Sequence, residues 1–305
     1  MEVLRDHRQA AWDSAAIAIG NFDGVHVGHR ALIAKARELA GSGKAVALTF
    51  DPHPSAVVGS GAPRAISSLE RRLELLAEAG LDAVVVEPFT RELAARSPEG
   101  FVDDILVRAL RAKAVVVGYD FSYGAQRGGT TQTLIAHGKR AGFEVAIVPA
   151  LQIDGAPASS TRIRALLADG KLADANRLLG RAWDVDGTVV HGAKRGRAIG
   201  VPTANIAPTS DLLVLPGIYA VTLTPDGEAP LPAVASLGRN PTFVEQGGLV
   251  LEVHVLDWDG DLYDRRVRTT FVGRLRDEAK FSSVDALVAQ IRRDIDDARV
   301  LLAQR

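Results

Sequence analysis

The sequence predicts an α/β protein of two domains: a parallel sheet covered by helices, then a small antiparallel β-barrel with a C-terminal helix. Three observations indicate this. The length of 305 residues suits two domains at roughly 150 residues each. Strand-like and helix-like segments alternate over about the first 180 residues. From Trp183 onward, strand-like runs follow one another without intervening helices.

Short apolar runs mark the predicted strands of the first domain, and segments with helical spacing lie between them. The strands are expected at 15–20, 45–50, 81–86, 114–118 and 144–149. The helices are expected at 29–40, 68–79 and 98–112. Ser97-Pro98-Glu99 gives the last of these a capping hydroxyl, a proline and an acid in its first turn. Strands rich in Ala and Val that alternate with helices indicate a parallel sheet covered on both faces, with ligands beyond the carboxyl ends of its strands.

The second domain is predicted as an antiparallel barrel because its short strands are separated only by turn residues. The strands are expected at 184–190, 217–224, 233–236, 249–256 and 266–272. A helix is expected to close the domain at 283–302, with Ser283 as its N-cap. The domains are therefore expected to span 1–182 and 183–305.

The composition excludes several classes of protein. Lys and Arg total 36 against 37 Asp and Glu, a net charge of −1, so no positive excess drives binding to nucleic acid or membranes. Cysteine is absent, which excludes disulfides, thiolate metal sites and a cysteine nucleophile. The segment Met1–Gln9 lacks the apolar core of a signal peptide, and no apolar run is long enough for a transmembrane helix. These features predict a cytoplasmic protein.

A glycine- and histidine-rich motif, Gly20-Asn-Phe-Asp-Gly-Val-His-Val-Gly-His29, follows the first predicted strand and opens a helix. Its three glycines allow a tight turn and a close approach to a ligand. A helix N-terminus favours phosphate, and His26 and His29 share one face of the first turn. Two imidazoles there can donate hydrogen bonds to a phosphate as charge builds up. The alternative is a capped helix with two solvated histidines; the position after the first strand favours a phosphate site.

This motif resembles the His-x-Gly-His signature of the nucleotidyltransferase superfamily and, at full length, that of bacterial bifunctional riboflavin kinase/FAD synthetases. Segments 49–54, 118–124 with 127–129, and 159–164 match the same family. The resemblance implies a Rossmann-like nucleotidyltransferase domain that adenylylates FMN with ATP, giving FAD and pyrophosphate. It makes His26 and His29 catalytic. It assigns the ATP phosphates to Gly20, Phe22, Asp23, Gly24, Gly28, Ser160, Thr161 and Arg162, and the flavin to Asp51, His53, Pro54, Asp120 and Phe121. Ala158 and Tyr119 depart from the usual residues of the family.

A second glycine-rich stretch, Gly187–Ile206, carries basic residues between its glycines. It lacks the Gly-Lys-Ser/Thr of a Walker A loop, but its backbone N–H groups can still wrap phosphates. Thr203 and Asn205 alternate on an extended segment and point to the same side. Their hydroxyl and amide oxygens are hard ligands that suit magnesium beside a nucleotide. The alternative is a flexible basic hairpin loop that ends in a turn.

Pro202-Thr-Ala-Asn205 resembles the signature of riboflavin kinases, and segments 215–220, 237–243, 251–254, 261–263 and 276–281 fit that family. The resemblance implies that this domain phosphorylates riboflavin to FMN. It assigns ATP to Gly192, Lys194, Gly196, Arg197, Gly200, Pro202 and Asn240, and Mg²⁺ to Thr203 and Asn205. It makes Glu252 the catalytic base; the alternative is an outward-facing strand glutamate. Asp264 and Arg265 replace a glycine that is common in the family.

The sequence therefore predicts a bifunctional enzyme with ATP and Mg²⁺ as co-substrate and cofactor and with riboflavin, FMN and FAD as substrates or products. Self-association stays open. A class I aminoacyl-tRNA synthetase also carries a His-x-Gly-His element, but it would normally add a Lys-Met-Ser-Lys-Ser-like loop, and the only methionine is Met1. A non-catalytic flavin carrier is a second alternative, but it would not need two nucleotide-phosphate loops.

Overall fold

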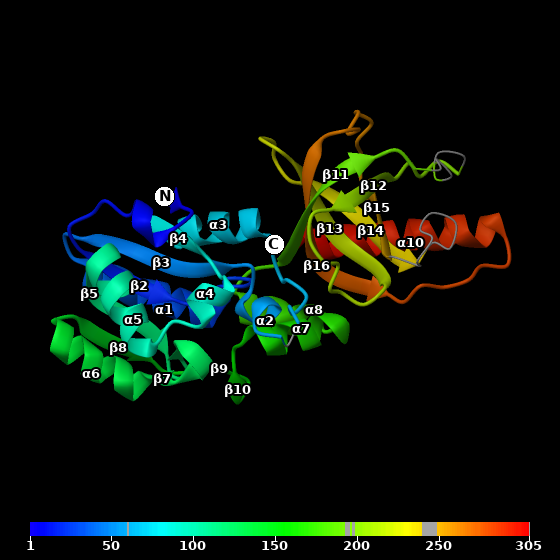
Figure 1. Ribbon diagram of the computed structural model, residues 1–305. Helices are drawn as coiled ribbons and strands as arrows, with labels where there is room; N and C mark the ends of the chain where they lie inside the picture. The colour runs from blue at the N-terminus through cyan, green and yellow to red at the C-terminus, as the bar shows by residue number, and fades with distance from the viewer. Residues whose placement is uncertain (60, 193–195, 197–198, 240–248, 305) are drawn as a thin grey trace. The chain divides into compact units, whose positions relative to one another are not determined.

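The computed structural model describes residues 1–304 except 60, 193–195, 197–198 and 240–248, and it divides into two compact units (Figure 1). The first unit comprises Met1–Arg64 with Leu69–Ser159, and the second comprises Ala65–Ser68 with Ser160–Arg305. The segment 160–182, which the sequence analysis assigns to the first domain, is counted with the second unit. The functional boundary at 182 and 183 stays a prediction.

The first unit is built on a six-stranded sheet in which every neighbouring pair of strands is parallel. Its order across the sheet is β1 (Glu2–Leu4), β4 (Ala83–Pro88), β3 (Lys44–Asp51), β2 (Ala15–Ile19), β5 (Ala112–Gly118) and β8 (Glu144–Val148). The predicted parallel sheet is thus confirmed. The sequence analysis missed β1, a three-residue edge strand too short to show an apolar pattern.

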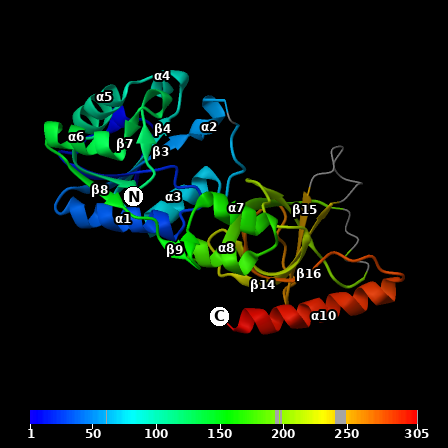
Figure 2. The same cartoon turned by 90° about the horizontal axis from the view of Figure 1, so that it is seen from below.

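Helices cover both faces of this sheet, as predicted (Figures 1 and 2). On β2, Ile17 and Ile19 point to one core, and Ala16 and Ala18 point to the other. The alanine side packs against α1 (Val27–Ala40) and α3 (Leu69–Glu78), because small side chains let a helix approach the strands closely. The isoleucine side packs against the segment after Ser97 and against α6 (Thr131–Ala141).

The predicted helix at 98–112 begins as expected, because the Ser97 hydroxyl accepts a hydrogen bond from the Gly100 N–H. It then differs: a short α5 (Pro98–Gly100) leads into the π-helix η2 (Phe101–Ala109), and β5 already begins at Ala112. The remaining short elements of the unit are η1 (His7–Gln9), α2 (Pro54–Val57), α4 (Arg91–Ala94), β6 (Ser122–Tyr123), η3 (Ala125–Arg127), β7 (Gly129–Thr130), β9 (Gln152–Ile153) and β10 (Ala156–Pro157).

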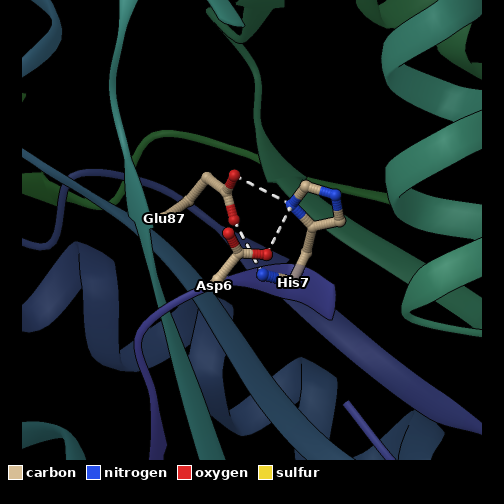
Figure 3. Close-up of side chains that lie close together, drawn as sticks. All are labelled: Asp6, His7 and Glu87. Atoms are coloured by element: carbon tan, nitrogen blue, oxygen red, sulfur yellow. Dashed lines mark hydrogen bonds and ion pairs between the residues drawn. The ribbon is translucent and has the colours of Figure 1, made fainter. Parts of the chain in front are cut away.

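A cluster of Asp6, His7 and Glu87 ties the N-terminal segment to the end of β4 (Figure 3). Glu87 Oε2 accepts from the backbone N–H of His7 at 2.9 Å, and Glu87 Oε1 lies 2.8 Å from His7 Nδ1. Asp6 caps η1 through the Arg8 N–H and also pairs with the Arg8 guanidinium. These contacts give all three side chains a structural role, because they attach η1 to the sheet.

The second unit contains a closed six-stranded barrel whose neighbouring strands are all antiparallel, which confirms the predicted barrel. Around the barrel the strands are β11 (Trp183–Val190), β12 (Ala204–Pro208), β15 (Leu249–Val255), β14 (Leu231–Arg239), β13 (Gly217–Pro225) and β16 (Arg266–Arg276). The predicted strand positions are recovered, and β12 is added where only an extended segment was expected. The closing helix is α10 (Val284–Ala303), and the Ser283 hydroxyl caps it by accepting from the Ala286 N–H.

The core of the barrel is centred on three aromatic rings, those of Trp183, Tyr219 and Phe271, all without solvent exposure. Two helices, α7 (Ser160–Ala168) and α8 (Leu172–Leu179), precede the barrel. The Asn176 carboxamide of α8 accepts from the Trp183 N–H and donates to the Phe271 carbonyl. Helix α8 is therefore bonded to both β11 and β16. No helix among the described residues is long and apolar enough to cross a membrane.

Candidate functional site

Three loops of the first unit come together at the carboxyl edge of its sheet. They follow β2, β3 and β5, and β2 lies between the other two strands. The chain moves from β2 to one side to form β3 and later to the other side to form β5. Ligands of open α/β sheets bind at this reversal of strand order. The sequence motifs at 20–29, 49–54 and 118–124 lie at this position, so the topology brings three of the four predicted segments together.

His26 is the N-cap of α1, and it is 6% exposed. Its Nδ1 accepts hydrogen bonds from the backbone N–H groups of Gly28 at 3.1 Å and His29 at 3.4 Å. An Nδ1 that accepts cannot carry the proton of a neutral imidazole, so the proton lies on Nε2. Burial lowers the pKa of His26 to about 4. At neutral pH, His26 is therefore an uncharged ring with one remaining donor, Nε2–H.

The imidazoles of His26 and His29 stack, with ring centroids 3.7 Å apart and 21° between their planes. Phe22 packs edge-on against His29 at 5.2 Å. His29 Nδ1 is buried and has no hydrogen-bond partner among the described residues. Burial, and then the nearby His26 and Arg72, lower the pKa of His29 well below 6.5. The structure thus brings the two predicted catalytic histidines together as a neutral pair.

The turn before the histidine pair is strained. Phe22 and Val25 have φ values of 51° and 40°, an unusual region for residues with a side chain, and both are fully buried. Strained backbone of this kind is held in place by surrounding structure and gathers at functional sites. Gly28 is needed for a different reason: a Cβ there would lie 3.0 Å from His26 Cε1 and 3.5 Å from the Ala158 carbonyl. The position of the His26 ring therefore depends on glycine at 28.

The loop after β3 contacts the loop after β2 directly. His53 caps the short helix α2, of which Pro54 is the first residue, by accepting from the Ser55 N–H. Its Nε2 lies 3.1 Å from Asn21 Nδ2. Asp51, at the end of β3, is exposed. Of the predicted flavin residues, these three lie beside the phosphate motif.

The loop after β5 carries the other two predicted flavin residues. Asp120 is exposed, and Phe121 is partly buried. The Phe121 ring stacks on Tyr123 at 5.6 Å and packs against the core of the unit. Phe121 thus has a packing role whatever else it does, and contact of either residue with flavin stays a prediction.

Ser160, Thr161 and Arg162 form the first turn of α7 and belong to the second unit. Their role in phosphate binding stays a prediction.

Arg72 is a residue that the sequence analysis missed. It lies on α3, outside every motif, and its Nη1 donates to Asn21 O and contacts Thr49 Oγ1 and Phe50 O. No sequence pattern marks Arg72. The neighbouring Arg71 is the same type of residue on the same helix, and only the direction of the side chain distinguishes the two.

The second unit presents the kinase motifs on neighbouring strands. Asn205 on β12 pairs with Glu252 on β15, and Glu252 also pairs with Ser236 on β14. Residues directly opposite in an antiparallel pair share one face of the sheet. Leu251 and Val253, on either side of Glu252, are fully buried, so Glu252 lies on the face opposite the barrel interior. The register therefore brings the predicted base next to a predicted magnesium ligand.

The glycine loop approaches the same two ligands. A Cβ at Gly192 would lie 2.1 Å from Asn205 Nδ2, and one at Gly196 would lie 3.5 Å from Thr203 Oγ1 and 2.2 Å from the Val201 carbonyl. Only glycine leaves room for this backbone, as expected of a loop that wraps a ligand. Gly200 has a φ of 77°. Lys194, Arg197 and Asn240 lie outside the described residues.

A pocket of about 360 Å³ opens beside Thr203 and Pro202. Its lining combines apolar and aromatic side chains with polar ones. It is formed by Val189, Pro202, Thr203, Ala204, Val253, Val255, Trp258, Asp259, Gly260, Asp261, Leu262 and Tyr263. His254 Nδ1 donates to the Pro202 carbonyl at 2.8 Å, and the His191 and Tyr263 rings pack at a tilt of 32° with their centroids 4.1 Å apart. Such a pocket suits a flat aromatic ring with a polar substituent near Thr203.

Comparison with known proteins matches each half of the chain to a different family. Residues 8–162 match the family described as FAD synthetase, and residues 179–302 match the family described as riboflavin kinase. Two relatives are named bifunctional riboflavin kinase/FMN adenylyltransferase. The one from Listeria monocytogenes is 40% identical over 293 residues, covering 94% of this chain and 92% of its own. The one from Escherichia coli K12 is 40% identical over 294 residues, covering 95% and 94%.

A crystal structure described as a macrolide-efflux protein from Streptococcus pneumoniae has the same fold. It is 30% identical, has a TM-score of 0.87, and the match covers 97% of this chain and 98% of the other. The two family matches fall on the two halves whose sites are described above, and the relatives match over nearly their whole length. The chain therefore belongs to the family of bifunctional riboflavin kinases/FMN adenylyltransferases.

Proposed function

We propose that the chain makes FAD from riboflavin in two steps, with FMN as the intermediate. The C-terminal domain phosphorylates riboflavin, and the N-terminal domain adenylylates FMN. Both steps use ATP. The observation that supports this most strongly is the match of each half of the chain to a different enzyme family. The balanced charge and the absence of a membrane-spanning helix among the described residues fit an enzyme with small-molecule substrates.

In the adenylyl transfer, a phosphate oxygen of FMN attacks the α-phosphorus of ATP and pyrophosphate leaves. Negative charge builds up on the α-phosphate oxygens, so fixed donors that point at them lower the barrier. The Nε2–H of His26 is such a donor, and it lies at the N-terminus of α1, where the helix dipole favours an anion. Because His26 is held by two backbone N–H groups and by its stack on His29, its donor needs little reorganisation.

The flavin phosphate is supplied from the side of β3 in this proposal. Asp51, His53 and Pro54 lie in the loop that contacts Asn21, next to the ATP loop. The two substrates then meet above β2, between the loops of β3 and β5. Holding the two substrates in the right geometry supplies a large share of the rate enhancement of such a transfer, because the reaction between them becomes effectively unimolecular.

In the kinase step, the 5′-hydroxyl of riboflavin attacks the γ-phosphorus of ATP, and ADP leaves. Glu252 orients this hydroxyl and accepts its proton. Asn205 lies opposite Glu252 in the strand register, so the proton acceptor and the phosphates are held side by side. The glycines at 192 and 196 bring backbone N–H groups to the phosphates, and the pocket at Thr203 takes a ring of one of the two substrates.

Thr203 and Asn205 fit Mg²⁺, since both offer neutral oxygen donors from adjacent outward positions and leave sites for phosphate oxygens. When bound, the metal supplies charge neutralisation on the transferred phosphate. The protein residues fix the positions of the phosphates, and Glu252 accepts the proton of the riboflavin hydroxyl.

The experiment is product analysis by chromatography with the full chain. Riboflavin with ATP and Mg²⁺ should give FMN and then FAD, and FMN with ATP should give FAD and pyrophosphate. Riboflavin that binds without turnover would indicate a flavin carrier. ATP–pyrophosphate exchange that depends on an amino acid would indicate an aminoacyl-tRNA synthetase. Product formation that persists unchanged in excess EDTA would contradict the magnesium site.

A further inference from the structure

Arg72 reaches the adenylyl-transfer site from a helix that carries none of its motifs. Its side chain is partly buried, and its Nη1 donates to the Asn21 carbonyl at 3.1 Å. The same nitrogen lies 3.4 Å from both Thr49 Oγ1 and the Phe50 carbonyl. Asn21 belongs to the loop after β2, whereas Thr49 and Phe50 lie at the end of β3. One guanidinium nitrogen therefore contacts both the loop after β2 and the end of β3, from which the predicted flavin loop leaves.

The acceptors of Arg72 are themselves linked. The Thr49 hydroxyl donates to the Asn21 carbonyl at 3.0 Å, so the same carbonyl receives hydrogen bonds from two side chains. The Asn21 side chain in turn lies 3.1 Å from His53 Nε2. Arg72, Thr49, Asn21 and His53 thus form one hydrogen-bonded chain from α3 to the predicted flavin loop. In such networks, removing one member leaves the others unpaired as well.

The charge of Arg72 also acts on the site. Asp23 and Asp51 attract the guanidinium, one from each loop, and an arginine side chain keeps its proton in a protein. Arg72 in turn lowers the pKa of His29, after the larger effects of burial and of His26. A fixed cation beneath two substrate loops favours the approach of two anionic substrates, a triphosphate and a flavin phosphate.

We propose that Arg72 is a positioning residue for adenylyl transfer, which joins the nucleotide loop after β2 to the flavin loop after β3 and fixes their spacing. This inference rests on the proposed function of the first domain. Arg72 does not take part in the chemistry; it sets the distance between the two bound phosphates. A misplacement of about 1 Å in such a site costs on the order of 100-fold in rate.

The test uses the full chain with three substitutions, Arg72→Lys, Arg72→Gln and Arg72→Met. Steady-state kinetics with FMN and ATP give kcat and KM for FAD formation. Riboflavin phosphorylation by the other domain is measured on the same samples. Arg72→Met should lower kcat for FAD formation by on the order of 100-fold, with smaller changes in both KM values, because the loops persist but lose their spacing. Arg72→Lys, which keeps a charged donor, should recover most of this loss, and Arg72→Gln should recover little.

Arg71→Met is the matched control. Arg71 is the neighbouring residue on α3 and is buried, and its Nη1 pairs with Glu74 and Glu78 of the same helix. It should alter thermal stability without lowering kcat for FAD formation more than a few-fold. Near-normal kcat in Arg72→Met, or equal losses in Arg72→Lys and Arg72→Met, or equal losses in Arg71→Met and Arg72→Met, would each overturn the proposal. If Arg72→Met does not fold, the contrast between the Lys and Gln variants decides.

The same assays distinguish a failure of the proposed function from a failure of the role proposed for Arg72. If the unmodified chain makes no FAD from FMN and ATP, the proposed function is wrong, whatever the variants do. If the unmodified chain makes FAD and the variants do so equally well, only the role of Arg72 is wrong.

Discussion

His26 and His29 are stacked with their ring centroids 3.7 Å apart, and the first of them caps the helix that carries the second. Capping places the acceptor Nδ1 of His26 against the backbone and turns Nε2–H away from it. Two stacked and enclosed imidazoles do not both carry a positive charge, because neither is solvated enough. The fold therefore prepares this pair as neutral hydrogen-bond donors, with their protons already in place before a substrate binds.

The first prediction is that this pair resists protonation. His26 should titrate with a pKa near 4 because of burial. The pKa of His29 should also lie well below 6.5, because burial and then the neighbouring His26 and Arg72 oppose its charge. The measurement is an NMR titration of the imidazole Hε1 signals. A midpoint of 6 or higher for His26 would contradict the buried neutral ring.

The second prediction concerns stability and follows from the same shift. The folded pKa of His26 lies below its unfolded value of 6.5, so the unfolded chain binds more protons between these two values. Stability is then fully present above pH 6.5 and is lost as pH falls toward 4, by about 1.4 kcal/mol for each pH unit from this group. Urea unfolding of the full chain at pH 7 and pH 5 measures the loss. The loss should be smaller in His26→Gln than in the unmodified chain.

The third prediction is that His29 matters for adenylyl transfer alone. His29→Ala removes the ring that stacks on His26 and an imidazole of the proposed donor pair. Losing one fixed donor typically lowers the rate by on the order of 100-fold. Chromatography should show FMN accumulating from riboflavin with little FAD. His137→Ala, in the same unit, should leave FAD formation within a few-fold of normal. Near-normal FAD formation by a folded His26→Ala/His29→Ala variant would remove the histidines from the mechanism.

The main features of the fold are predictable from the sequence, because periodicity reflects burial. Runs such as 15–20 and 45–50 are buried on both faces and read as central parallel strands. In the barrel, buried apolar residues alternate with polar ones around Glu252, which indicates that one face of this strand points into the barrel. Short elements are not predictable, because β1 has three residues and β12 has five and follows the glycine-rich stretch. The π-helix at Phe101–Ala109 is not predictable from the sequence either, since the spacing of its apolar residues also fits an α-helix.

The site is only partly predictable. Motifs mark His26 and Gly28, because their chemistry requires a particular residue at a particular place. The stacking of His26 on His29, the tautomer and the lowered pKa values depend on contacts from Phe22 and α3, which no local pattern encodes. Arg72 shows this most clearly. It and Arg71 are adjacent arginines on one helix, and only the direction of the side chain separates a residue of the site from one that pairs with glutamates of its own helix.

The fourth prediction concerns the extent of the kinase domain. Asn176 of α8 bonds to Trp183 and to Phe271, so the barrel includes contacts from before residue 183. A fragment 160–305 should fold and phosphorylate riboflavin without making FAD. A fragment 183–305 should unfold at a lower temperature, because a backbone N–H and a carbonyl lose their partners. Thermal unfolding and kinase assays of both fragments measure this. Equal stability of the two would show that α7 and α8 contribute nothing to the barrel.

The fifth prediction is that Glu252 is the base of the kinase step. Its register opposite Asn205 and Ser236 places a carboxylate where the hydroxyl of riboflavin meets the phosphates in our proposal. Glu252→Gln keeps the size of the side chain but removes the basic oxygen. General-base assistance is typically worth roughly 100- to 10,000-fold, so kinase turnover should fall by that factor with little change in riboflavin binding. Turnover assays that start from riboflavin and from FMN give the two activities separately.

The design of the last test depends on the two activities lying on different domains. With FMN as substrate, Glu252→Gln should make FAD at close to the normal rate, because the histidine pair is untouched. Glu228→Gln is the matched control: Glu228 pairs with Arg265 elsewhere in the second unit and should leave both rates unchanged. Equal losses from riboflavin and from FMN would indicate a packing defect. If neither rate falls in a folded Glu252→Gln variant, Glu252 is an ordinary outward-facing strand residue, and the proton goes to another group or directly to solvent.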